Sequence, residues 1–247
     1  QWPAAVLHDL ITRAQYAMAK KDVRIYLNGM HWSASGGTLS MAATDGHRMA
    51  VGSIGCAAEE AFEVIIPCAA IPEIVKALSG QESCRLTVSA NKIMLETDDL
   101  TLMIVALSGR YPDVSKVIPD PAAAMTVTAN TSVFREALNQ ALIVAGEMRN
   151  PSIQIEIIDL TTMRIEAVSE RGDTGAFEVP VVSGGELLAC FNPVYLWDAI
   201  ENIEAEEVKL LFGNNGDPNA ALTVMDLGST SKNILMPLRC GARANVG

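Results

Sequence analysis

The feature that most constrains the fold is a pattern of helices and strands that runs through the sequence twice. In the first run, Ile66-Pro67 precedes a segment with helical periodicity, and in the second run residues 190–193 precede another. Residues 24–27 align with residues 152–156 in the same way, and both offsets are about 125 residues, a period that indicates a duplicated unit. Two unrelated domains of similar size remain the alternative.

The first run predicts two helices and a set of strands. Apolar residues recur at helical spacing over residues 4–19 and again over residues 69–78. Gly36-Gly37 predicts a turn between two of the strands. The alternation of apolar and polar residues places the strands at 23–27, 38–43, 62–66, 84–89, 92–97 and 100–107.

The second run follows a predicted linker of Pro119, Pro121 and residues 122–124. Asn130, Thr131 and Ser132 are N-cap candidates for a helix over 132–145, and Asn192-Pro193 opens another helix that extends to residue 203. The predicted strands are 153–158, 163–168, 208–212, 221–225 and 232–237. We therefore predict an α+β protein in which two helices pack on antiparallel sheet in each domain, with domains at 1–119 and 120–247.

Composition excludes several classes of protein. Hydrophobic residues make up 49% and charged residues 19% of the chain, which is typical of a folded globular protein. No run of eighteen apolar residues is present, so we expect no membrane-spanning helix and a cytoplasmic protein. The five cysteines are odd in number and form no Cys-x-x-Cys pair, which predicts reduced thiols and no structural zinc site.

The net charge of −11 argues against a protein that grips DNA by neutralising many phosphates. A protein that encircles DNA needs only a locally positive inner surface. Arg13, Lys20, Lys21 and Arg24 form a basic cluster in or just after the first predicted helix. The cluster is equally consistent with phosphate contacts and with ordinary surface charge.

The densest polar motif, residues 43–48, contains Thr44, Asp45 and His47. These residue types serve acid–base catalysis, but they lie within four positions around an Asp-Gly turn and catalytic groups usually come from distant segments. A hydrogen-bonded turn is the favoured interpretation. The acidic run at 201–207 similarly favours a solvated helix end over a metal site. No nucleotide-binding loop is present, and we expect no catalytic residue, metal or cofactor.

Five segments together resemble the bacterial DNA polymerase III beta subunit, the sliding clamp family. They occur in the family's order and span nearly the whole chain. The segments are 26–30 (YLNGM), 43–50 (ATDGHRMA), 108–113 with 117–119 (SGRYPD and VIP), 191–195 (FNPVY) and 236–239 (MPLR).

The resemblance implies a non-catalytic protein whose relatives have three similar domains per chain. Two such chains close a ring around duplex DNA, and a groove between the second and third domains takes hydrophobic peptide tails. The peptides belong to replicative and repair polymerases and to the clamp loader. This sequence matches the second and third domains only. We therefore expect a homodimeric ring for a full-length protein and a monomer for this chain, which begins at Gln1-Trp2-Pro3 without Met and is interpreted as a fragment.

The resemblance also assigns roles in peptide binding and DNA contact to particular residues of this chain. Apolar walls with a few polar groups suit a peptide groove, although core packing would equally explain about half of the apolar positions. DNA-facing residues by the same comparison are Arg13, Lys20, Lys21, Arg24 and Tyr26. The groove residues are Leu27, Thr44, Gly46, His47, Arg48, Met49, Pro112, Lys116, Val117, Met148, Asn192, Tyr195, Ile234, Leu235, Met236, Pro237, Leu238 and Arg239.

Three features depart from the family pattern. Lys116 stands where the family often has Arg, and Cys68-Ala69 open a helix where relatives often carry basic residues, so we expect weak and salt-dependent DNA affinity. The tail 240–247 is small and polar; we expect it to be loose, lying across the groove or inert. Two alternatives stay open: a diverged clamp-like protein of a mobile element with other partners, and a small hydrolase that uses Asp45 and His47.

Overall fold

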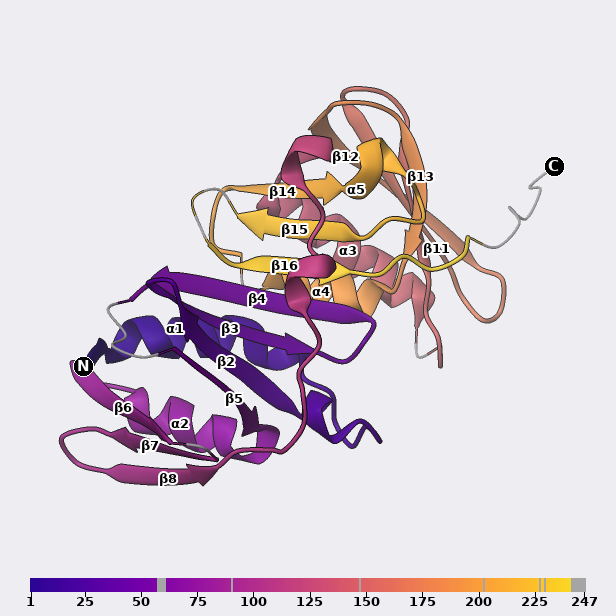
Figure 1. Ribbon diagram of the computed structural model, residues 1–247. Helices are drawn as coiled ribbons and strands as arrows, with labels where there is room; N and C mark the ends of the chain where they lie inside the picture. Colours follow the sequence, from indigo (N-terminus) through magenta and orange to yellow (C-terminus); the bar gives the residue numbers. More distant parts are fainter. Residues whose placement is uncertain are drawn as a thin grey trace. The chain divides into compact units, whose positions relative to one another are not determined.

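The computed structural model describes residues 1–56, 61–89, 91–146, 148–201, 203–226, 228 and 230–240. The chain forms two compact units (Figure 1). The first contains Gln1–Val114 and Thr230–Lys232, and the second contains the remaining residues. Most of the expected loose tail, residues 241–247, lies outside the described residues.

The first unit packs two helices against two antiparallel sheets. The sheets have strand orders β4-β3-β2-β5 and β1-β6-β7-β8. Helix α1 contacts α2 and touches β3 and β4 of one sheet and β6 of the other, so the buried core lies around the helices. The elements are β1 (Trp2–Pro3), α1 (Ala4–Ala14), η1 (Gln15–Ala17), η2 (Ile25–Leu27), β2 (Gly29–Ser35), β3 (Thr38–Thr44), β4 (Arg48–Gly55), β5 (Phe62–Pro67), η3 (Cys68–Ala70), α2 (Ile71–Leu78), β6 (Ser83–Ser89), β7 (Lys92–Glu96) and β8 (Thr101–Val105).

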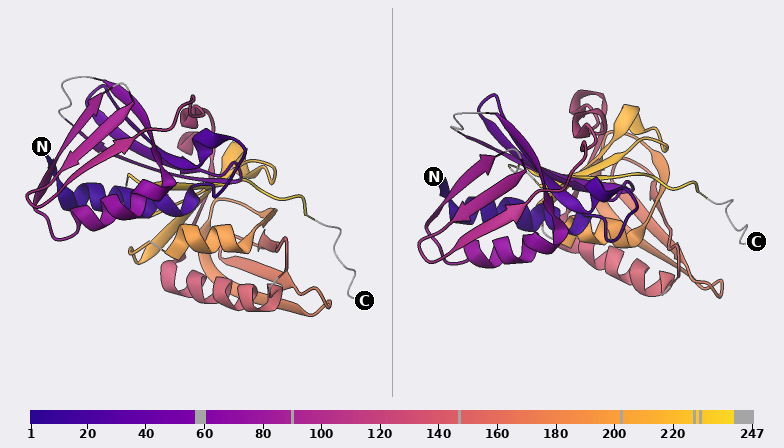
Figure 2. Two further views of the ribbon diagram at one scale, coloured as in Figure 1. Left: turned by 90° about the horizontal axis from the view of Figure 1, so that it is seen from below. Right: turned by 60° about the horizontal axis from the view of Figure 1, so that its bottom comes forward.

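The second unit packs its two long helices against one antiparallel sheet of order β13-β10-β11-β12-β9-β14-β15-β16. Both views of Figure 2 show α3 beside α4, and α3 also contacts β9, β11 and β12. After η4 (Val114–Lys116) and η5 (Pro121–Ala123), the elements are β9 (Met125–Asn130), α3 (Thr131–Ala145), β10 (Ile153–Ile157), β11 (Thr162–Val168), β12 (Thr174–Ser183), β13 (Leu187–Phe191), α4 (Pro193–Glu201), β14 (Glu207–Phe212), α5 (Gly213–Gly216), β15 (Leu222–Asp226) and β16 (Lys232–Leu235).

The predicted duplication is confirmed by the order of elements. Leaving short helical turns aside, each unit runs strand, helix, four strands, helix, three strands. The spatial order of strands also matches, with one difference. In the second unit β9 pairs with both β12 and β14, whereas the two-residue β1 pairs with β6 and belongs to a sheet separate from β4.

The predicted helix starts are confirmed where a capping residue precedes them. Asn130 Oδ1 accepts hydrogen bonds from the backbone N–H groups of Ser132 and Val133, at 3.1 and 3.2 Å. Asn192 Oδ1 accepts from Val194 N at 2.9 Å in the same way. These bonds satisfy amide groups that the first helical turn leaves without partners, so the local sequence fixes where α3 and α4 begin.

The predicted strand at 23–27 is wrong, and so is its alignment with residues 152–156. Residues 25–27 form η2, and the strand equivalent to β10 is β2. Asn28 explains the difference, because its side chain donates to Asp22 O and accepts from Asp22 N, both at 2.8 Å. Side-chain bonds of this kind compete with a strand ladder, and they leave Val23 95% exposed.

The expectation that all thiols are reduced is also wrong. Cys190 and Cys240 form a disulfide whose Cα atoms are 5.3 Å apart. Cys190 lies on β13 and Cys240 lies five residues after the end of β16, so the sheet brings together two residues that are 50 positions apart. Cys56, Cys68 and Cys84 are free.

Candidate functional site

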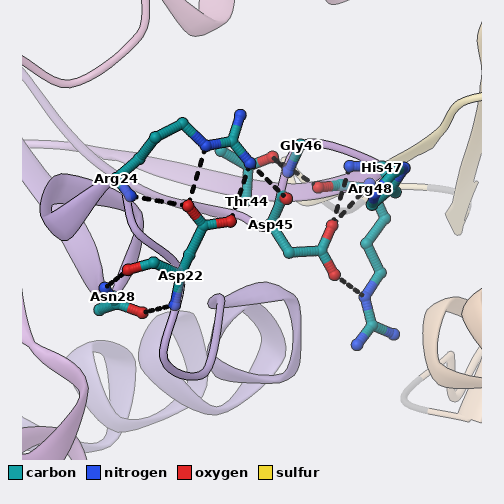
Figure 3. A network of polar contacts seen from close by, with 8 residues as sticks. All are labelled: Asp22, Arg24, Asn28, Thr44, Asp45, Gly46, His47 and Arg48. Carbon is teal, nitrogen blue, oxygen red and sulfur yellow. Dashed lines mark hydrogen bonds and ion pairs between the residues drawn. The ribbon is translucent and has the colours of Figure 1, made fainter.

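The polar motif around Asp45 is the hydrogen-bonded turn that joins β3 to β4, as predicted (Figure 3). Asp45 Oδ1 accepts from the backbone N–H groups of His47 and Arg48, at 2.9 and 3.1 Å. Thr44 Oγ1 donates to Arg48 O at 2.6 Å and accepts from Gly46 N at 3.0 Å. The two side chains thus satisfy the backbone of the turn and hold His47 exposed at its tip.

Arg24 approaches this turn from the loop before β2. Its Nη2 atom donates to Asp45 O at 3.3 Å and to Asp22 Oδ2 at 2.9 Å. The side-chain hydrogen bond from Arg24, together with the Arg24 backbone N–H at 2.8 Å, lowers the pKa of Asp22 to about 2. Asp22 therefore stays ionised at neutral pH and keeps Arg24 in place beside the turn.

Position 46 requires glycine for two reasons, the backbone conformation of the turn and the lack of room for a side chain. Its φ of +92° lies in the region that residues with a Cβ atom rarely adopt. A Cβ atom there would lie 3.1 Å from Arg24 Nη2. The glycine therefore allows the guanidinium to pack directly on the turn.

Arg48 anchors the other side of the hairpin to η1. Its Nε atom pairs with Asp45 Oδ2 at 3.1 Å, and its Nη2 atom donates to Tyr16 O at 3.1 Å. The guanidinium carbon also lies 5.2 Å from the centre of the Tyr16 ring, within the range of a cation–π contact. Only 13% of the Arg48 side chain and 17% of the Asp45 side chain are exposed, so the pair is shielded from solvent.

The same contacts argue against a catalytic dyad of Asp45 and His47. Asp45 holds the backbone N–H of His47 through Oδ1, and its other oxygen pairs with Arg48. A general base needs a carboxylate oxygen directed at a substrate proton or at an imidazole N–H. Both oxygens of Asp45 instead serve the turn and its anchor.

The remaining predicted residues of the first unit divide between core and surface. Leu27 and Met49 are 1% and 4% exposed and serve packing, whereas Pro112 is exposed. Tyr111, which the sequence analysis did not single out, holds the chain just before Pro112. Its ring stacks on His31 with centroids 4.9 Å apart, and His31 Nε2 lies 3.0 Å from Glu63 Oε1. Burial raises the pKa of Tyr111 and lowers that of His31.

In the second unit, the last predicted segment changes from buried to exposed along its length. Ile234 and Leu235 are 1% and 2% exposed in the core, whereas Met236 and Leu238 are 43% and 40% exposed. Leu238 N donates to Cys190 O at 2.7 Å, which sets residues 236–239 beside the end of β13. Large apolar side chains thus reach solvent on an ordered segment.

Asn192 follows β13 directly, so it lies two residues from the backbone bridge between Cys190 and Leu238. Tyr195 is partly buried against the core of the unit. The structure therefore brings 192–195 and 236–239 to the same end of the second unit. Lys116 and Val117 are exposed, and Met148 is half-buried just after α3.

The predicted DNA-facing residues carry less free charge than the sequence indicates. Arg13 Nε pairs with Asp9 at 2.8 Å, and Arg24 pairs with Asp22 at 2.9 Å. Lys20 and Lys21 are exposed after η1, and Tyr26 packs partly buried beside Leu27. A phosphate would have to compete with carboxylates for both arginines.

Two further features are absent from the described residues. Over the ranges given above, no group of three His, Cys, Asp or Glu residues is arranged to hold a metal ion. Among these same residues, none of the helices is long and apolar enough to cross a membrane.

Comparisons with known proteins cover both units. The family model described as the DNA polymerase III beta subunit, central domain, matches residues 1–113, and the model of its C-terminal domain matches residues 115–239. The beta sliding clamp of Pseudomonas aeruginosa is 30% identical over 238 residues, which is 94% of this chain and 63% of that protein. The beta sliding clamp of Proteus mirabilis is 30% identical over 96% of this chain and 64% of its own length.

Solved structures show the same likeness. The crystal structure of the DNA polymerase sliding clamp from Pseudomonas aeruginosa with ligand matches with a TM-score of 0.90 at 30% identity, and covers 97% of this chain and 65% of the other. A second structure of that organism's clamp, bound to griselimycin, matches with a TM-score of 0.89 at 30% identity over 96% of this chain and 64% of the other. The chain thus spans less than two thirds of the length of these relatives.

Proposed function

The chain belongs to the DNA polymerase III beta subunit family, and from this premise we propose that it is a non-catalytic, peptide-binding part of a sliding clamp. Its partners would be the peptide tails of replicative and repair polymerases and of the clamp loader. As part of a complete homodimeric ring it would hold these proteins on duplex DNA. The proposed location is the cytoplasm, at the nucleoid.

One observation carries this proposal: both predicted wall segments are ordered, and both expose side chains to solvent. The turn holds His47 exposed at its tip, and the segment after β16 leaves Met236 and Leu238 about two-fifths exposed. Apolar walls with a few fixed polar groups are typical of peptide-binding surfaces. Methionine suits such a wall because its flexible thioether adapts to different partners.

The test is the binding of a fluorescently labelled peptide from the C-terminal tail of a replicative polymerase. We expect His47→Ala to weaken binding by about 1–2 kcal/mol, the usual contribution of one hydrogen bond. Met236→Ala should weaken it through lost apolar contact. Val168→Ala is the control, since Val168 is an exposed apolar residue on β11 outside the predicted site. No binding at high micromolar peptide, in the unmodified chain, would overturn the proposal.

The proposed DNA contacts are weak, because Arg13 and Arg24 are already paired with carboxylates. We expect Lys20→Ala with Lys21→Ala to remove most of the residual affinity for duplex DNA. That affinity should fall steeply with salt, as phosphate contacts do. We also expect this chain to be monomeric, and a stable closed dimer by light scattering would contradict that expectation.

A further inference from the structure

The segment after β16 is attached to the rest of its unit by very little. In the part of the chain that the structure describes, residues 236–240 make one backbone hydrogen bond, from Leu238 N to Cys190 O. The preceding strand β16, by contrast, pairs with β15 along residues 233–235. The disulfide between Cys190 and Cys240 is the second attachment, two residues beyond that hydrogen bond.

The two attachments act on the same short stretch of an open sheet edge. Strand β13 is the last strand of its sheet, with β10 as its partner on the inner side. Its outer edge therefore has backbone groups available for another segment. Leu238 uses one of these groups, and the disulfide closes the chain back onto the same residue of β13.

The two cysteine residues of the disulfide differ in exposure. Cys190 is 4% exposed, whereas Cys240 is exposed. Thiol–disulfide exchange requires a thiolate to reach one sulfur of the bond, so attack occurs at the accessible sulfur. Disulfides with an exposed sulfur are also the more readily exchanged ones, unlike those enclosed in a core.

We propose that Cys190 and Cys240 form a reversible redox latch that holds residues 236–239 along β13 when oxidised and releases them when reduced. The oxidant is a low-molecular-weight disulfide such as glutathione disulfide. The Cys240 thiolate attacks one of its sulfurs, a mixed disulfide forms and one glutathione leaves as a thiol. The Cys190 thiolate then attacks Cys240 Sγ and releases the second glutathione. Two protein thiols lose two electrons in total, and one small disulfide becomes two thiols.

The latch rests on the proposed function in one respect, because residues 236–239 form the predicted second-unit wall for the peptide. An ordered wall binds more tightly than a loose one, since the loose segment must lose conformational freedom on binding. The oxidised chain is therefore the form with the higher peptide affinity. Cys190 also lies two residues before Asn192, so the latch joins both predicted wall segments of this unit.

The first experiment equilibrates the full chain with defined ratios of reduced and oxidised glutathione, then alkylates the thiols and identifies them by mass spectrometry. We expect Cys190 and Cys240 to change together, in one two-electron transition within the glutathione range. Cys68, which is free, should be alkylated at every ratio. A pair that stays oxidised, or stays reduced, at all ratios would overturn the proposal.

The second experiment measures amide hydrogen exchange of Leu238 in both redox states. We expect exchange about ten-fold faster in the reduced chain, because release of the segment opens its one hydrogen bond. Cys240→Ser should behave as the reduced chain under all conditions, and Cys68→Ser should behave as the unmodified one. Equal exchange in the oxidised and reduced chains would contradict the latch.

Peptide binding separates failure of the latch from failure of the proposed function. The oxidised chain should bind the labelled polymerase-tail peptide about three- to ten-fold more tightly than the reduced chain. Equal binding in both states overturns the latch and leaves the proposed function intact. Absence of binding in both states overturns the proposed function, while the thiol and exchange measurements still decide whether the segment is latched.

Discussion

The turn at Asp45 in the first unit and the segment at 236–239 in the second are predicted to contact the same peptide, yet they are held by different chemistry. The turn is fixed by many polar contacts, including those from Thr44, Arg24 and Arg48. In its described part, the second segment is fixed by the backbone bridge between Leu238 and Cys190 and by a disulfide. The first arrangement therefore depends on ionisation, and the second depends on redox conditions.

The difference teaches that two segments of one chain, both predicted to bind the same peptide, can respond to different conditions. A network of polar contacts can lose its members one at a time, and the Asp22 carboxylate in it responds to pH. A covalent bond is present or absent, and it responds to thiols. The following predictions perturb one part while leaving the other unchanged, from the largest expected effect to the smallest.

Reduction of the disulfide should have the largest effect. Closing a chain across a separation of 50 residues restricts the unfolded state, and a loop of that size contributes roughly 4 kcal/mol to the unfolding free energy. Denaturant unfolding with and without reductant should show this loss in the second unit, and Cys240→Ser should reproduce it. Cys68→Ser should retain the full sensitivity to reductant. If reductant lowers the unfolding free energy by less than about 1 kcal/mol, the disulfide orders its own segment but contributes little to the stability of the unit.

Asp45→Ala should destabilise the first unit by about 2–3 kcal/mol, because it removes two backbone hydrogen bonds and a shielded ion pair. Asp45→Asn is the matched control. Its side-chain oxygen still accepts from the turn but carries no charge for Arg48, so its effect should be smaller. Denaturant unfolding gives both values. If the two variants lose equal stability, the ion pair, rather than the turn bonds, holds the hairpin.

Gly46→Ala should destabilise the same unit by about 1–2 kcal/mol, because alanine is strained at a φ of +92°. Gly80→Ala measures this strain alone, since Gly80 has a φ of +76° and a Cβ atom there would meet nothing within 4 Å. The excess cost at Gly46 reports the displacement of Arg24. Thermal unfolding of both variants gives the comparison, and a smaller cost at Gly46 than at Gly80 would contradict the close packing of the guanidinium.

The smallest effect should be the pH dependence that Asp22 gives to the stability of the first unit. The pKa of Asp22 is lowered to about 2 by its bonds from Arg24, against an ordinary value of 3.8. The Asp22 contribution is therefore complete above about pH 4 and is lost as the pH falls towards 2. An NMR titration of the Asp22 carboxyl measures the pKa directly, and Asp22→Asn should remove this part of the pH dependence. A midpoint near 3.8 would show that the pair with Arg24 is not formed in solution.

Much of the fold follows from local sequence. The helices α3 and α4 begin where Asn130 and Asn192 predict, because a capping bond needs only neighbouring residues. The strands between α2 and the end of the first unit also follow their alternating pattern. Strand β12 is absent from the prediction, and it includes Gly175 and Pro180, which disfavour a strand interior.

The candidate site is predictable to a smaller extent. Periodicity and the resemblance select Leu27 and Met236 alike, although one is 1% exposed and the other 43%. The role of Tyr111 has no local signal either, because its partner His31 lies on β2, far earlier in the chain. Exposure and stacking depend on which distant segments cover a residue. The residues that surround a position in the sequence do not reveal which distant segments will cover it.

The sequence by itself determined the duplicated order of helices and strands, the helix starts and the family, because periodicity, capping and motif spacing act over short distances. Only the tertiary structure decided that Cys190 meets Cys240, that Tyr111 stacks on His31, and that Leu27 is buried while Met236 is exposed. Each of these outcomes depends on a competition between contacts. Which contact forms is decided by the packing of the folded chain, because packing brings together groups that are remote in the sequence.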